Sequence, residues 1–203
     1  MRYIDNTLIN CMAYKGKALV NPVTGQSIKF LQTRSDTGGQ LLEMETTYNA
    51  RSTEPLAHYH PYQDEDFKVL DGEVRVKLNG EIITLKAGYT LNIPANQTHA
   101  MWNDSDKKAV VNWQVRPAMN TEYLFETTWG LAADGKVNKK GMPNILQLAL
   151  TINKYSDVFR TIKPPLVVQK IMFGVLTPVA YLLGYRPTYK KYIYKKLHSS
   201  NPL

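Results

Sequence analysis

The sequence of 203 residues predicts a mainly β fold, an antiparallel barrel or sandwich, followed by C-terminal α-helices. Two observations support this prediction. Apolar and polar residues alternate along short runs up to about Trp129, which is typical of strands with one buried face. From Met142 onward, apolar residues recur every three or four positions, which is the period of a helix. We therefore place a β-barrel with N-terminal strands in residues 1–130 and a helical extension in residues 131–203.

The clearest strand pair is a hairpin. Residues 73–78 alternate between polar and apolar side chains, and the dipeptide at 79–80 is Asn-Gly. Both residues tolerate positive φ, so this dipeptide favours a type I′ turn. The chain then returns along residues 82–85. Further strands are expected at residues 89–94 and 110–115, so short antiparallel strands follow one another closely.

Three helices are expected in the extension. Asn144 is a plausible N-cap for a helix over residues 145–162, which the two prolines at 164–165 must end. A second helix, with its apolar residues on one side, is expected over residues 168–182. A short third helix is expected over residues 189–197. We expect this extension to pack on the barrel or on a partner subunit.

The net charge of +8 is confined to the last quarter of the chain. Residues 1–153 hold 16 basic and 16 acidic residues, whereas residues 154–203 hold 9 basic residues and one acid. Such asymmetry can indicate an anionic partner. Nucleic acid is not expected, because the barrel is neutral and carries no recognition motif. The uncharged stretch 171–185 contains Pro178 and is short for a membrane span of about 20 residues.

We therefore interpret the C-terminal helices as a packing and homodimerisation device. Contact with an anionic membrane surface is the less favoured alternative, because such basic and aromatic patterns are weak signals.

The compartment is also suggested by the sequence. The single cysteine, Cys11, excludes an internal disulfide and fits a reducing environment, and we expect it to be a small buried side chain rather than a nucleophile. No secretory signal pattern is found at the N-terminus. We expect a cytoplasmic protein.

A cluster of metal-ligand residue types begins at His58. His58 and His60 share one face of a strand, because side chains two residues apart point to the same side. Glu65 follows a short turn and can lie opposite the two histidines. His99 can join them from a neighbouring strand. Three imidazoles and one carboxylate suit a divalent transition metal.

These residues form two motifs that resemble those of the cupin superfamily. The first family motif is G-x5-H-x-H-x3,4-E-x6-G, and the second is G-x5-P-x-G-x2-H-x3-N. The matching residues are His58, His60, Glu65 and Gly72 for the first motif, and Gly88, Pro94, His99 and Asn103 for the second. The resemblance implies a double-stranded β-helix, also called a jelly-roll barrel. It also implies one divalent transition metal per chain, held by His58, His60, Glu65 and His99.

Two positions depart from the family motifs. Ser52 replaces the glycine that opens the first motif, and Asn96 replaces the glycine within the second. Asparagine tolerates the left-handed conformation, so the turn at Asn96 is expected to survive. The flanking sequence resembles bacterial single-domain cupins in which the barrel also carries a helical C-terminal extension.

The implied site has consequences for chemistry. Four protein ligands on a metal that favours six leave about two positions for a small molecule, and Fe, Mn, Ni, Co and Zn are all acceptable metals. We expect an enzyme of dioxygenase or isomerase type that acts on a small oxygen-rich molecule, aromatic or polyketide-like. The alternative is a non-catalytic cupin module that binds a small molecule or a metal.

The histidine count limits the mechanism. With three of the four histidines at the metal, only His198 in the basic tail remains. Proton transfer then falls to a metal-activated water molecule, to Glu65, or to Glu43 or Glu45, although the last two are better explained as an exposed charged face. Glu65 is the catalytic candidate. Three further side chains are expected to point inward, either as apolar pocket walls or as barrel core: Phe67, Val69 and Met101.

Overall fold

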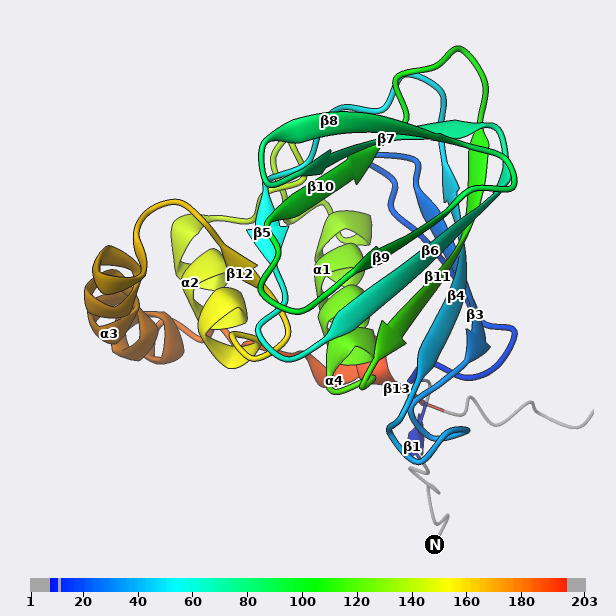
Figure 1. Ribbon diagram of the computed structural model, residues 1–203. Helices are drawn as coiled ribbons and strands as arrows, with labels where there is room; N and C mark the ends of the chain where they lie inside the picture. The colour runs from blue at the N-terminus through cyan, green and yellow to red at the C-terminus, as the bar shows by residue number, and fades with distance from the viewer. Residues whose placement is uncertain (1–7, 11, 197–203) are drawn as a thin grey trace, which may run out of the picture.

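Two antiparallel sheets face each other and form the barrel (Figure 1). The computed structural model describes residues 8–10 and 12–196, so Cys11 and His198 lie outside the described residues. The six-stranded sheet contains, in spatial order, β2 (Ala18–Val20), β3 (Ser27–Gln32), β4 (Leu42–Tyr48), β11 (Ala109–Arg116), β6 (Asp64–Asp71) and β9 (Thr90–Ile93). The five-stranded sheet contains β12 (Arg160–Thr161), β5 (His58–Tyr59), β10 (His99–Trp102), β7 (Glu73–Leu78) and β8 (Glu81–Lys86). This arrangement confirms the expected jelly-roll barrel.

The barrel core is built from alternate residues of both sheets. Phe67 and Val69 from β6 meet Val76 from β7 and Met101 from β10 in one buried apolar cluster. Phe67, Val69 and Met101 therefore point inward as expected, and they serve as core. A second cluster lies between β3, β4 and the first helix and includes the fully buried Phe30.

The β7–β8 hairpin follows the sequence expectation. Asn79 and Gly80 both have positive φ, at +51° and +96°. The two strands then pair in register from Glu73↔Lys86 to Leu78↔Glu81. Local turn chemistry and alternation therefore agree at this point.

One helix was not expected. α1 (Thr121–Ala133) occupies residues that we assigned to strands and turns up to Trp129. Its buried face includes polar side chains, so no helical apolar period is visible. Glu122 accepts a hydrogen bond from the backbone nitrogen of Arg34 at 2.6 Å, and Glu126 pairs with Lys17. The boundary that we placed at residue 130 stays a prediction.

The first helix of the extension is shorter than expected. α2 (Ile145–Lys154) is capped by the Asn144 side chain, which accepts from the backbone nitrogens of Leu146 and Gln147. The helix was expected to reach residue 162, and this was wrong. Tyr155 and Val158 are buried by a turn instead of a helix, and the chain then joins the barrel as β12.

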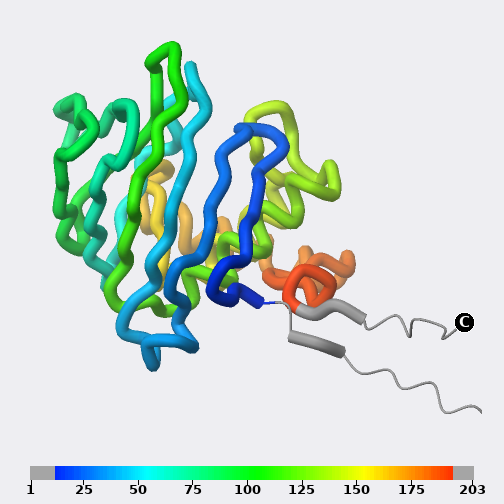
Figure 2. The backbone as a smooth tube through the Cα atoms, turned by 90° about the vertical axis from the view of Figure 1, so that its right-hand side faces the viewer, coloured from blue at the N-terminus to red at the C-terminus, as the bar shows by residue number. Residues whose placement is uncertain are grey.

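The last helices also differ in part from the expectation. α3 (Leu166–Leu182) forms as expected and packs against α2, which separates it from the barrel in Figure 1. The third helix was expected over residues 189–197, but α4 (Lys190–Ile193) has only four residues. The chain instead continues as β13 (Tyr194–Lys196), because β1 (Leu8–Asn10) offers an antiparallel partner. Figure 2 shows α4, in red, beside the blue N-terminal strands.

We predict that two glycine substitutions will separate backbone strain from steric clash. Gly72 and Gly88 both have positive φ, but a Cβ atom at Gly72 would lie 2.5 Å from the Lys108 carbonyl oxygen, whereas Gly88 has open space. Gly88→Ala should lower the free energy of unfolding by about 1–2 kcal/mol through strain alone. Gly72→Ala should cost about 1–3 kcal/mol more because of the clash. Urea denaturation measures both losses, and equal losses would contradict the close approach at Gly72.

Candidate metal centre

Three imidazoles meet inside the barrel because strand pairing places them there. His58 on β5 lies directly opposite His99 on β10 in the antiparallel register. His60 is two residues further along the same face as His58. One ring nitrogen from each histidine lies within 4.8 Å of the corresponding atoms of the other two. The structure therefore brings together the three histidines that the sequence singled out.

Glu65 approaches the histidines from the facing sheet. It lies on β6 and is 1% exposed. Its Oε1 atom is 3.3 Å from Nε2 of His60, and its Oε2 atom is 2.8 Å from Nε2 of His99. The turn after His60 thus carries the chain from one sheet to the other, as the sequence suggested.

Backbone carbonyl groups fix the orientation of all three rings. Nδ1 of His58 donates to the carbonyl of Leu56 at 3.0 Å, and Nδ1 of His99 donates to that of Gln97 at 3.0 Å. Nδ1 of His60 donates to the carbonyl of Val158. A carbonyl oxygen only accepts, so in each neutral ring the Nδ1 atom holds the proton and Nε2 presents a lone pair. This is the arrangement that second-sphere hydrogen bonds give to metal-binding histidines.

The residues present fit a divalent cation. Nε2 of His60 and Oε2 of Glu65 are buried and have no hydrogen-bond partner among the described residues. In the neutral tautomers, the lone pairs of His60 and His99 point at a carboxylate, which is unfavourable unless a cation lies between them. Three nitrogen donors and one carboxylate match the ligands that Fe, Mn, Ni, Co and Zn accept.

Burial and mutual charge perturb the pKa values of the cluster. Burial lowers the pKa of His60, and burial together with the two neighbouring imidazoles lowers that of His58. Burial opposes the charged form of His99 as well, but the negative charge of Glu65, whose Oε2 lies 2.8 Å from Nε2 of His99, outweighs it and raises the pKa. For Glu65, the nearby imidazoles outweigh burial and lower the pKa. A proton therefore competes with a metal for the space between His99 and Glu65.

Trp113 is a member of the site that sequence reasoning missed. Its indole Nε1 donates to Oε1 of Glu65 at 3.0 Å, and its ring stacks on Phe67 with centroids 5.6 Å apart. The sequence placed this residue only on a strand. Its position opposite Phe67 on β6 brings it to the site, but strand pairing is not visible in a single sequence.

The C-terminal extension also contributes to the site. Phe159 stacks on His58 with ring centroids 4.7 Å apart, and Thr161 on β12 pairs with His58 on β5. The carbonyl of Val158 orients His60. Residues 158–161 therefore form a strap against the histidines. The sequence did not predict this strap, because the apolar spacing of these residues continued the helical period of α2.

The two departures from the family motifs have local explanations. Ser52 replaces a glycine, and its hydroxyl accepts from the backbone nitrogen of Asn103 at 2.9 Å, which ties two loops together. Asn96 has φ of +66°, as expected, and its side chain donates to the carbonyl of Pro61 at 3.2 Å. Its backbone nitrogen also donates to the carbonyl of His60 at 2.8 Å, so this loop holds the end of the H-x-H segment.

Glu43 lies away from the cluster. Its carboxylate accepts hydrogen bonds from the side chains of Gln32, Asn112 and Gln114 on neighbouring strands. These amide contacts outweigh burial and lower the pKa of Glu43. Glu43 is thus part of an outer polar face, as the sequence favoured, and Glu65 is the acid that contacts the imidazoles.

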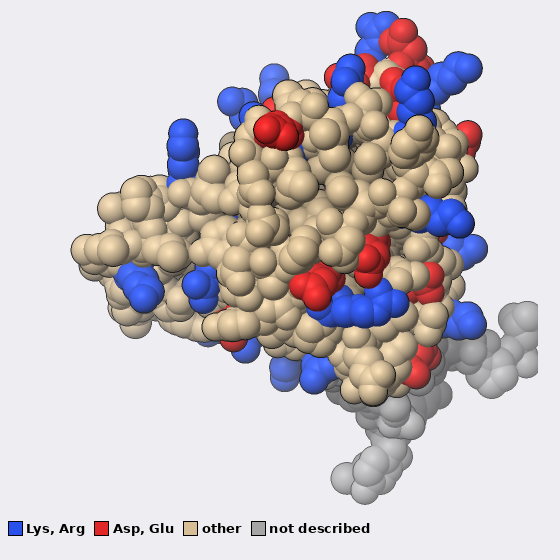
Figure 3. Space-filling view, viewed as in Figure 1, with Lys and Arg blue, Asp and Glu red and all other residues tan. Residues whose placement is uncertain are grey.

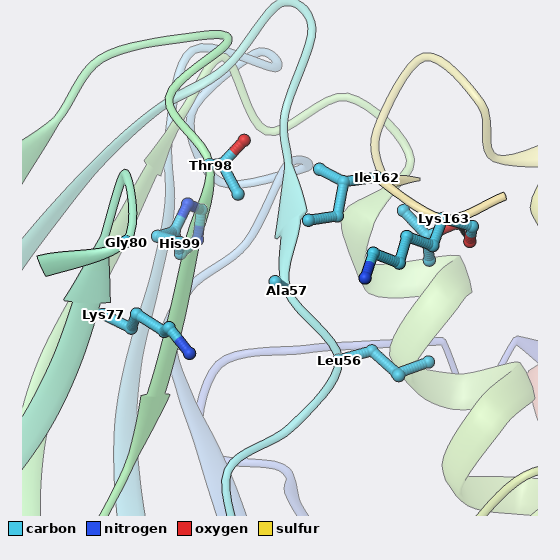
Figure 4. A pocket seen from close by; sticks show the side chains of 9 residues that line it. Leu56, Ala57, Lys77, Gly80, Thr98, His99, Ile162 and Lys163 are labelled. Carbon is cyan, nitrogen blue, oxygen red and sulfur yellow. Dashed lines mark hydrogen bonds between the residues drawn. The ribbon is translucent and has the colours of Figure 1, made fainter. Parts of the chain in front are cut away.

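A pocket of 310 Å³ touches the cluster at His99 (Figure 4). Its other lining residues are Leu56, Ala57, Lys77, Gly80, Thr98, Thr161, Ile162 and Lys163. Lys77 and Lys163 extend toward the space from opposite sides in Figure 4. Lys77 is held by Glu54 at 3.1 Å.

The fold and the cluster together define a jelly-roll barrel with a cluster of three histidines that could hold a metal ion. Residues 44–115 match the family model of the cupin domain, so this part of the chain is a cupin domain.

Three similar proteins align with only part of this chain. Polyketide synthase CurC of Streptomyces cyaneus is 37% identical over 30% of this chain and 39% of its own length. Tetracenomycin polyketide synthase protein TcmJ of Streptomyces glaucescens is 31% identical over 46% of this chain and 62% of its own length. Quercetin 2,3-dioxygenase of Bacillus subtilis (strain 168) is 29% identical over 41% of this chain and 25% of its own length. The chain thus spans less than two thirds of each of these relatives.

We predict that Trp113→Phe weakens metal binding. The substitution keeps an aromatic ring but removes the donor that orients Glu65, and loss of such an outer contact lowers metal affinity about 10–100-fold. Trp129→Phe is the matched control, because Trp129 is a buried indole of the second apolar cluster. Calorimetric titration with Zn²⁺ or Ni²⁺ measures both affinities. Equal affinities for the two variants would contradict the role of Trp113.

Proposed function

We propose that the protein is a mononuclear divalent-metal cupin enzyme that acts on a small oxygen-rich molecule, as a dioxygenase or an isomerase. The observation that carries this proposal is the set of three imidazoles whose Nδ1 atoms are bound by backbone carbonyls. Their Nε2 lone pairs are left for a cation beside the buried Glu65. His58, His60, His99 and Glu65 would hold the metal.

The metal would supply Lewis-acid or O2 chemistry to a bound substrate. Among residues 8–10 and 12–196, the histidine group contains only His58, His60 and His99, with Glu65 beside it. Four protein ligands leave coordination positions for a substrate with two adjacent oxygens.

Glu65 is the catalytic candidate in this proposal. Its Oε1 atom accepts from Trp113, and its Oε2 atom has no hydrogen-bond partner in the described part of the chain. Oε2 is therefore the atom that can bind the metal or take a proton from the substrate. His198, the fourth histidine of the sequence, lies outside the described residues.

Two features favour an aromatic or polyketide-like substrate. Phe159 adds an aromatic face beside His58. Lys77 and Lys163 flank the pocket at His99 and offer positive charge to a phenolate or enolate oxygen.

The pocket volume of 310 Å³ is at the lower end of the range of about 300–1,000 Å³ for small-molecule sites. Two of the similar proteins are named as polyketide synthase proteins and one as quercetin 2,3-dioxygenase, which supports the same substrate class.

We predict that His58→Ala/His60→Ala abolishes metal binding. Two of the three nitrogen ligands are lost, so elemental analysis should find one metal ion per wild-type chain and almost none per variant chain. Tyr62→Ala is the matched control, because Tyr62 is 59% exposed and lies beside the cluster in sequence. Full metal retention in the double variant would overturn the ligand assignment.

We also predict that catalysis depends on the metal. Wild-type protein should consume O2, or isomerise the compound, with at least one of catechols, flavonols and β-diketones. A chelator should abolish this activity, and readdition of one divalent metal should restore it. Oxygen-electrode and NMR product assays measure both reactions. If Fe, Mn, Ni, Co and Zn each bind and the compounds bind without being converted to product, the protein is a non-catalytic binding module.

A further inference from the structure

The outward face of α3 is apolar and exposed. Leu182 is 87% exposed and Ile171 is 66% exposed. The other exposed apolar residues of this face, which we call the α3 face, are Val167, Val168, Val175 and Val179. Contiguous apolar surface of this kind usually marks an interaction site.

α3 is firmly attached through its opposite side. Phe173 and Ala180 are buried, and the helix packs against α2. Gln169 is also buried, and its side-chain nitrogen donates to the carbonyls of Thr161 at 3.0 Å and Pro164 at 2.6 Å. The α3 face therefore lies on the side of the helix away from these contacts. The expectation that the extension packs on the barrel or on a partner subunit stays a prediction.

The charged residues within α3 and next to its two ends in the sequence are basic. They are Lys163, Lys170 and Arg186. Lys170 is the charged residue within α3. Arg186 is anchored at the helix end by hydrogen bonds to the carbonyls of Tyr181 and Tyr185. In Figure 3 the lobe at the left is a broad tan surface with blue side chains on it.

This charge pattern indicates which partner binds the α3 face. A second copy of the chain docked on the α3 face would bring two sets of lysines together, and like charges at an interface oppose association. An anionic bilayer surface neutralises the same lysines while the apolar side chains enter the boundary between headgroups and acyl chains. None of the helices in the described part of the chain is long and apolar enough to cross a membrane.

We propose that the α3 face binds the surface of a membrane that contains anionic phospholipids, with the helix lying in the membrane plane. Val167, Ile171 and Val175 enter the interface, and Lys170 and Arg186 contact lipid phosphates. The helix of 17 residues offers a contact about 25 Å long. This proposal is independent of the metal chemistry, because it uses none of the cluster residues.

Vesicle cosedimentation of the full chain tests the proposal. Wild-type protein should bind phosphatidylcholine vesicles that contain phosphatidylglycerol, and should bind less as salt increases. Ile171→Asp should weaken this binding about tenfold through lost apolar burial. Lys170→Gln should weaken it about fivefold through the loss of one charge.

Matched variants on the barrel serve as controls. Ile82 is 55% exposed on β8, and Lys86 is exposed at the end of the same strand. Ile82→Asp and Lys86→Gln should bind the vesicles as wild type does. Light scattering without lipid reports self-association. No binding at low salt, equal binding by all variants, or a dimer that Ile171→Asp dissociates would each overturn the proposal.

Discussion

The site depends on one constraint, a carboxylate with a free oxygen buried among three imidazoles. Glu65 is 1% exposed, and Oε2 lies 2.8 Å from the Nε2 atom of His99. A charge in such a place is costly unless an opposite charge compensates it. Because carbonyl groups bind the Nδ1 atoms of the three rings, the imidazoles present lone pairs to the same point. A cation held between the two sheets would stabilise this arrangement.

Several distant segments are arranged around that constraint. The Asn96 loop holds the backbone of His60, Trp113 orients Glu65, and the Val158 carbonyl orients the His60 ring. The strap of residues 158–161 comes from the C-terminal extension, far from the motifs in sequence. The extension is therefore part of the site and more than an appendage of the barrel. Its α3 face is exposed, which leaves that face available for another contact.

The sequence predicted the barrel and the meeting of the cluster because both depend on local rules. Alternation gives the strand faces, and the spacing of His58 and His60 places them on one side. It did not predict α1, because Glu122 and Glu126 are buried on that helix and interrupt its apolar pattern. The sequence also predicted that α2 reaches residue 162, because Tyr155 and Phe159 continue its helical period. In the structure, Tyr155 is buried by a turn and Phe159 stacks on His58. Contacts made between sheets, such as Trp113 with Glu65, require strand pairing that one sequence does not show.

The most direct measurement of the central claim is X-ray absorption spectroscopy of the metal-loaded wild-type protein. The account predicts three imidazole nitrogens and one carboxylate oxygen around a single ion, with the remaining positions taken by light atoms from solvent. The imidazole count is diagnostic, because the scattering of the ring atoms beyond the ligand nitrogen is distinct. A spectrum with fewer than two imidazoles, or with a sulfur ligand, would contradict the account.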